Sequence, residues 1–144
     1  MAGHKAANAA PTWPDINGSL IPGSVFTKGS FLLNLVGNKI TVHFIHRTIA
    51  YFLLILTIIL TLKLNNANSP AHPWMKYRWI PFGLIVLQVS LGVFSVLASR
   101  DIIPNQWGLF EWMAQFHQIT AMLLLLCFTA LLYLVRRKSF MPAS

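Results

Sequence analysis

The sequence predicts an all-α fold, a multi-pass membrane helical bundle of three transmembrane helices with the N-terminus outside and the C-terminus inside. Two counts point to a membrane: 56% of the 144 residues are hydrophobic and only 10% are charged, whereas soluble domains carry about 25% charged residues. The third observation is three apolar stretches near the ~20 residues that cross a ~30 Å hydrocarbon core. Nucleic-acid binding is excluded because the basic residues are scattered among apolar runs and form no basic face.

The expected elements follow in chain order. Residues 1–38, with many prolines and glycines, form an extracytoplasmic segment. The helices cover 39–64, 79–98 and 112–135. A cytoplasmic loop (65–78) and an extracytoplasmic loop (99–111) connect them, and 136–144 form a cytoplasmic tail. The third helix is the cleanest, because no charge lies between Glu111 and Arg136, whereas the first opens with the polar stretch TVHFIHR.

The charges predict the orientation. One side holds basic residues and no acid, namely Lys63, Lys76, Arg78, Arg136, Arg137 and Lys138, and the other side holds the acids Asp15, Asp101 and Glu111. By the positive-inside rule the basic side faces the cytoplasm. We therefore expect the cell inner (cytoplasmic) membrane, in preference to a mitochondrial inner membrane.

Two histidines are expected to meet inside the bundle. His46 lies about two turns from the outer end of the first helix and His117 about as far into the third, ~10 Å deep at 1.5 Å per residue. Both helices run inward, so the two imidazoles can face each other. This is the geometry of a bis-histidine haem, with each ring nitrogen about 2 Å from the iron. Arg47, next to His46, is placed to neutralise a haem propionate.

Other interpretations remain open for these residues. The histidines can instead bond neighbouring helices while Arg47 extends to lipid headgroups. His43, one turn before His46, is a candidate second ligand, supporting group or proton carrier. Gln88 is interpreted as an interhelical hydrogen-bonding residue in preference to a ligand contact. The lone Cys127 excludes an intrachain disulfide, and the absence of carboxylates from the spans excludes a di-iron site.

Four stretches together resemble the haem A synthase family, the membrane enzymes that convert haem O to haem A. They are TWPDINGSLIP at 12–22, VHFIHRTIAY at 42–51, LQVSLG at 87–92 and FHQITA at 116–121. Their order and spacing extend over nearly the whole chain. The family has eight transmembrane helices in two similar four-helix halves, and this chain resembles the C-terminal half without its first helix.

The resemblance implies roles for these residues. It assigns His46 and His117 as axial iron ligands of haem b. Arg47, from its position beside His46, and His43 are further expected cofactor-binding residues. His43 stands where the catalytic half carries a carboxylate, which favours cofactor binding over substrate oxidation. The half that accepts haem O is expected to be missing, through truncation or a split gene, so the expected partners are the N-terminal half or a homo-oligomer, and membrane lipid. No catalytic residue is assigned.

The expected function is the haem-b-binding part of haem A synthase, an oxidoreductase that oxidises the C8 methyl of haem O to the formyl of haem A for cytochrome c oxidase biogenesis. The alternative is a small b-type cytochrome membrane subunit that relays electrons for a respiratory dehydrogenase. Such a subunit shares His46 and His117 but has no use for the loop pattern at 13–22. A haem-free scaffold is a third class.

Overall fold

The computed structural model describes residues 7–27, 29–66, 77–103 and 106–139. Within these ranges the regular elements are helices, and no strand is present. The chain runs through η2 (Ala7–Ala9), η3 (Gly23–Phe26), α1 (Phe31–Gly37), α2 (Lys39–Asn66), α3 (Ile80–Ala98), η5 (Ser99–Asp101) and α4 (Leu109–Ser139). Most of the expected inner loop (67–76) and the end of the expected tail (140–144) lie outside the described residues.

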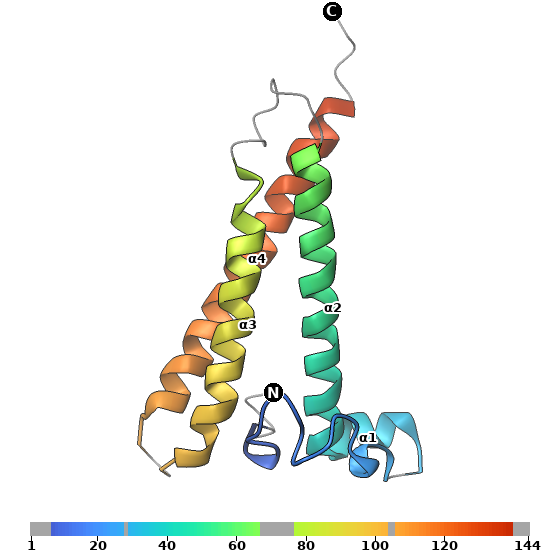
Figure 1. Cartoon of the computed structure of the whole chain (residues 1–144), viewed down its shortest axis with the longest axis vertical. Helices are drawn as coiled ribbons and strands as arrows, with labels where there is room; N and C mark the ends of the chain where they lie inside the picture. The colour runs from blue at the N-terminus through green and yellow to red at the C-terminus, as the bar shows by residue number, and fades with distance from the viewer. Residues whose placement is uncertain (1–6, 28, 67–76, 104–105, 140–144) are drawn as a thin grey trace, which may run out of the picture.

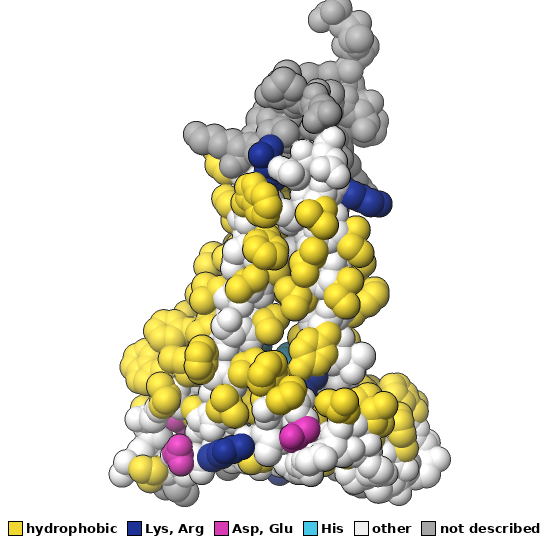
Figure 2. Space-filling view, viewed as in Figure 1, with side chains coloured by type: hydrophobic (Ala, Val, Ile, Leu, Met, Phe, Trp, Pro, Cys, Tyr) yellow, Lys and Arg dark blue, Asp and Glu magenta, His cyan; other side chains and the backbone are white. Residues whose placement is uncertain are grey.

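The all-α prediction with three spans is confirmed. Three helices are long and apolar enough to cross a membrane, Lys39–Asn66, Ile80–Asp101 and Leu109–Leu134, and only 17% of each apolar window is buried within the chain. Helices that expose this much apolar surface need an apolar solvent. Hydrophobic side chains cover the middle of the face seen in Figure 2, and charged side chains gather toward its ends.

The three long helices leave one helix partly separated from the other two. α2 and α4 run in one direction and α3 in the other, and α3 packs along α4 more extensively than it packs on α2 (Figure 1). The N-terminal segment lies across the end of the bundle where α2 and α4 begin and α3 ends (Figure 1). This shared end is the expected outer end.

Asn38 separates α2 from the short helix α1, which the sequence analysis did not foresee. Its Oδ1 accepts hydrogen bonds from the backbone N–H groups of Ile40 and Thr41 at 3.0 and 3.4 Å, as an N-cap does. Its Nδ2 donates to the carbonyl of Ser24 at 2.7 Å. The cap therefore also ties the N-terminal segment to the start of α2.

The third span begins a few residues earlier than the expected position 112. The side chain of Glu111 accepts a hydrogen bond from the backbone N–H of Gly108 at 2.8 Å, which caps the first turn of α4. A carboxylate in the first turn also interacts favourably with the helix dipole. The helix consequently starts at Leu109.

Hydroxyl groups inside the apolar helices are satisfied locally. The hydroxyls of five residues each donate to the carbonyl four residues earlier in the same helix: Thr48, Thr57, Thr61, Ser90 and Thr129. Such a bond removes the cost of placing an unpaired hydroxyl in hydrocarbon. These residues accordingly serve the helices and contribute no free polar group to a site.

Candidate functional site

His46 of α2 and His117 of α4 face each other across the bundle, as expected from their matched depth. Their ring centroids lie 6.1 Å apart, and the ring planes are inclined by 62°. An imidazole nitrogen binds a metal at about 2.0–2.1 Å, so two rings on opposite sides of one iron have centroids roughly 6 Å apart. The spacing of the two rings therefore fits a single iron between them.

A cavity of about 1270 Å³ separates α2 from the pair formed by α3 and α4. Its polar lining includes His43, His46, Arg47, Gln88 and His117, and most of the remaining lining is apolar. Small-molecule sites commonly measure about 300–1,000 Å³ and combine apolar walls with a few polar groups. A cavity of this size and lining suits a large, flat and mostly apolar cofactor.

Among the described residues, no three His, Cys, Asp or Glu side chains lie close enough together to bind one metal ion. A bare metal ion held by protein alone commonly requires about four ligands. A haem iron has four of its six positions filled by the porphyrin, so two histidines complete it. The donor set of this cavity therefore fits a haem and does not fit a bare ion.

His117 is held by α3 on two sides. Its Nδ1 lies 3.0 Å from the backbone carbonyl of Gln88, and its Nε2 lies 3.1 Å from Nε2 of the Gln88 side chain. Gly92 permits this approach, because a Cβ at that position would lie 3.0 Å from Cε1 of His117. The imidazole is thus packed against the backbone of α3 one turn beyond Gln88.

His43 lies one turn before His46 and is wholly buried, with 0% of its surface exposed. Neither of its ring nitrogens has a hydrogen-bond partner among the described residues, and the side chain lines the cavity. An unpartnered buried polar group is costly and calls for an explanation. His43 therefore has two ring nitrogens at the cavity wall that no described residue binds.

Arg47 binds the N-terminal segment. Its Nη1 donates to the carbonyls of Pro14 and Asp15 at 3.2 and 2.6 Å, and its Nη2 donates to those of Ala10 and Thr12. The side chain is only 9% exposed. Its Nε is also buried and has no partner among the described residues. The two terminal nitrogens of the guanidinium thus bind the N-terminal segment, while the Nε–H remains for the expected role beside a propionate.

Two further contacts fasten the N-terminal segment over the end of the cavity. Nε of Arg100, in the turn after α3, donates to the carbonyl of Pro11 at 2.8 Å. The indole Nε1 of Trp13 donates to the hydroxyl of Tyr51 on α2 at 3.1 Å. The segment is therefore attached both to α2 and to the end of α3.

A tight turn gives the segment its shape. Residues 16–19 form a two-residue hairpin in which Asn17 and Gly18 have positive φ angles of 54° and 89°. This is the type I′ turn that the Asn-Gly pair favours. The N–H of Gly18 donates to Oδ1 of Asp15 at 3.0 Å. Hydrogen bonds from the Thr12 side chain and the Gly18 backbone hold the pKa of Asp15 below its ordinary value of 3.8.

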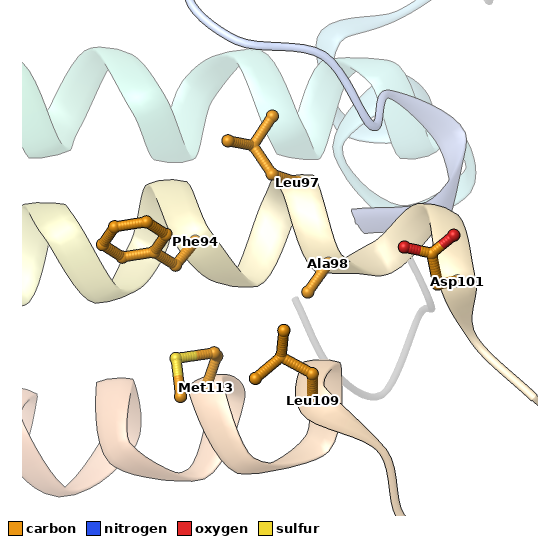
Figure 3. A pocket seen from close by; sticks show the side chains of 6 residues that line it. All are labelled: Phe94, Leu97, Ala98, Asp101, Leu109 and Met113. Carbon is orange, nitrogen blue, oxygen red and sulfur yellow. The ribbon is translucent and has the colours of Figure 1, made fainter.

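A second, smaller cavity of about 460 Å³ lies between α3 and the start of α4. Figure 3 shows its lining side chains, Phe94, Leu97, Ala98, Asp101, Leu109 and Met113, of which only Asp101 is polar. This cavity brings together no pair of groups that could bind a metal or move a proton.

The structure brings His43, His46, Arg47 and His117 to the same cavity, and it adds residues that the sequence analysis did not single out for this site. Gln88 was expected only to bond another helix, and its partner is His117 itself. The groups that bind Arg47 are backbone carbonyls, so no pattern of side chains in the sequence could have indicated them. The Asn17–Gly18 pair was the one available signal for the folded turn, since this dipeptide is a strong short-range hairpin signal.

Comparison with known proteins identifies the family. The model of the cytochrome oxidase assembly protein family matches residues 1–130. The chain is 33% identical over 128 residues to a haem A synthase of Bartonella tribocorum, covering 89% of this chain and 33% of that protein. It is 32% identical over 102 residues to a haem A synthase of Brucella suis, covering 71% of this chain and 28% of that protein.

The chain thus spans about a third of the length of the curated relatives it matches. No solved structure matches it. The match to the family model extends over the N-terminal segment, both candidate ligands and most of α4. The chain therefore belongs to the cytochrome oxidase assembly protein family, and its resemblance to the haem A synthases is confirmed.

Proposed function

We propose that this chain is the haem-b-binding part of a haem A synthase, the oxidoreductase that converts the C8 methyl of haem O to the formyl of haem A for cytochrome c oxidase biogenesis. The observation that carries the proposal is the pair His46–His117, whose ring centroids lie 6.1 Å apart beside a large apolar cavity. The similarity to haem A synthases favours this role over that of a small b-type cytochrome subunit.

Each site residue has a distinct part in the proposed function. His46 and His117 supply the two axial nitrogens. His43 and Nε of Arg47 lie one turn apart on α2, and both are buried without a partner among the described residues. Two N–H donors on one helix face suit the carboxylate of a propionate. When bound, the haem supplies one-electron transfer, and the protein holds its two faces and its charged edge.

The chain spans about a third of the length of its relatives, and we propose that a further half completes the unit. The lipid-facing surface of the three helices leaves room for further helices, supplied by an N-terminal half or by a second copy of this chain. In this proposal that half binds haem O, and no catalytic residue is assigned in this chain. We place the complex in the cell inner (cytoplasmic) membrane, because the matched relatives are bacterial.

The first experiment tests haem binding. The full chain is purified in detergent, loaded with haem b and examined by reduced-minus-oxidised spectroscopy. We expect a low-spin bis-histidine spectrum that is lost in His46→Ala and in His117→Ala, since each removes one axial ligand. His4→Ala, far from both ligands in sequence, serves as the matched control and leaves the spectrum unchanged. A missing haem signal, or one that survives both substitutions, contradicts the proposal.

The second experiment tests the enzymatic role. The chain is co-expressed with a candidate N-terminal half in cells that make haem O, and haems are extracted for chromatography. Haem A is expected with the intact pair, and its absence is expected when His46→Ala is used. Haem b binding without any conversion of haem O would favour the electron-relay alternative.

A further inference from the structure

We propose that Gln88 is the positioning residue of His117: its backbone carbonyl selects the ligand-competent tautomer, and its side-chain amide occupies the coordinating nitrogen until the cofactor arrives. This inference rests on the proposed function, because it concerns how the iron ligand is prepared. Its starting point is that both ring nitrogens of His117 contact one residue of α3, at 3.0 and 3.1 Å.

The two contacts define the protonation of the ring. A carbonyl oxygen only accepts hydrogen bonds, so Nδ1 of His117 carries the proton that is donated to the Gln88 carbonyl. In the neutral ring Nε2 then holds a lone pair and accepts from the amide N–H of Gln88. Metal-bound histidines commonly donate their other N–H to a carbonyl in this way, which fixes the tautomer and the ring orientation.

The amide is a temporary partner. Nε2 is the nitrogen that the iron needs, so the Gln88 side chain must move when the ring binds the metal. Only one end of the amide is held, because its Oε1 is buried and has no partner among the described residues. On binding a haem iron at Nε2, His117 would lose only this hydrogen bond, and its Nδ1 proton would stay hydrogen-bonded to the Gln88 carbonyl.

The backbone keeps the ring in place during this exchange. The carbonyl of Gln88 cannot follow its side chain, because it belongs to the main chain of α3. A Cβ on Gly92 would lie 3.0 Å from Cε1 of His117, so the ring rests closely against the helix. The carbonyl contact and this packing together hold the Nδ1–Cε1–Nε2 edge of the ring against α3.

The test compares haem b binding by the wild-type chain and by Q88M. Methionine has nearly the same length and no N–H donor, so the competing hydrogen bond disappears while the backbone carbonyl stays. We expect the Kd for haem b to fall about 2- to 10-fold, the net worth of one hydrogen bond. Q115M is the matched control, since Gln115 lies exposed on α4 and is not among the residues that line the cavity; its Kd should equal the wild-type value.

A second variant and a second measurement protect the test against misfolding. Q88N keeps an amide but is one methylene too short to reach Nε2, and it should tighten binding as Q88M does. Without haem, 15N spectra of histidine-labelled protein should show His117 protonated on Nδ1 in the wild type and in both variants, with the Nε2 resonance shifted only in the variants.

The outcomes separate the two proposals. Weaker haem binding in Q88M and Q88N, or His117 protonated on Nε2 in the wild type, would overturn the role of Gln88. A wild-type chain that binds no haem through His46 and His117 would overturn the proposed function, while the nitrogen spectra would still decide whether Gln88 caps the ring.

Discussion

Arg47 attaches the N-terminal segment to α2 at the point where α2 carries the candidate iron ligand His46. The candidate iron ligand His46 is followed directly by Arg47, whose guanidinium binds four backbone carbonyls of the N-terminal segment. The planar fork of arginine suits several acceptors at once, and a lysine would reach fewer of them. The position of the segment and the position of the His46 ring are therefore coupled through a single turn of α2.

Replacing Arg47 should test this coupling. We expect Arg47→Ala to lower the free energy of unfolding by about 2–3 kcal/mol, the scale of hydrogen bonds to a charged group, measured by chemical unfolding in detergent. Haem retention should fall less than in His46→Ala or His117→Ala. Arg100→Ala, which removes one exposed hydrogen bond, should cost less than about 1 kcal/mol. Equal losses in the two arginine variants would show that Arg47 is not the main attachment.

The turn at Asp15 predicts a defined pH dependence. The pKa of the Asp15 carboxyl is held below 3.8 by the Thr12 side chain and the Gly18 N–H. A lowered pKa of an acid means that the turn is stabilised above about pH 4, the unfolded value, and loses this contribution as the pH falls through the folded value. The Gly18 amide resonance should follow this titration with a midpoint below 3.8.

Two variants check the origin of the Asp15 shift. Thr12→Ala removes its largest cause and should raise the midpoint of the Gly18 titration toward the ordinary value. Asp15→Asn should abolish the titration, because an amide does not ionise in this range. A wild-type midpoint at or above the ordinary value would contradict the hydrogen bonds assigned to the turn.

Among the elements, α3 acts as the support of the site although it supplies no ligand. It carries the carbonyl of Gln88 and the open surface of Gly92, and both lie against His117 of α4. α3 also packs more closely on α4 than on α2. The α3–α4 pair therefore forms one wall of the cavity, and α2 brings His43, His46 and Arg47 to the opposite side.

Two glycines of α3 make a matched pair for testing this support. A Cβ on Gly92 would meet His117 at 3.0 Å, whereas a Cβ on Gly83 meets nothing within 4 Å. We expect Gly92→Ala to displace the ring and weaken haem b binding about 10-fold or more, the lower end for loss of a ligand's support. Gly83→Ala should bind haem normally and gain up to about 1 kcal/mol in helix stability. Equal haem binding by both variants would contradict the close packing of Gly92.

At the scale of the whole molecule, the three spans expose most of their apolar surface, and only 17% of each apolar window is buried. The outer surface is available to lipid or to the partner helices of the proposed complex. The N-terminal segment and the turn after α3 share one end of the bundle, since Arg100 binds Pro11. The charges predict that this end faces away from the cytoplasm.

The orientation can be measured with single cysteines in a Cys127→Ser background. S19C lies in the N-terminal hairpin, and S144C lies at the C-terminus. In intact bacterial cells a membrane-impermeant maleimide should label S19C and leave S144C unlabelled until the membrane is opened. The reverse pattern would contradict the positive-inside assignment.

The parts predicted from sequence are those set by local composition. The three spans follow from apolar length, and the pairing of His46 with His117 follows from equal depth on helices that run the same way. The contacts of Arg47 with the N-terminal segment and the proposed role of Gln88 depend on backbone carbonyls. Only folding brings these carbonyls within hydrogen-bond distance of Arg47 and His117. Helix α1 escaped prediction because its seven residues are too few to show a period.

The contact between Arg100 and the carbonyl of Pro11 joins residues 89 positions apart, and those of Arg47 reach back 32 to 37 positions. Contacts of such long range form only after the intervening chain exists. During synthesis the N-terminal segment can thus settle on α2 early but reaches its second attachment only once α3 has crossed the bilayer. The attachment of the N-terminal segment at the end of the cavity is therefore completed late, after the second span has inserted.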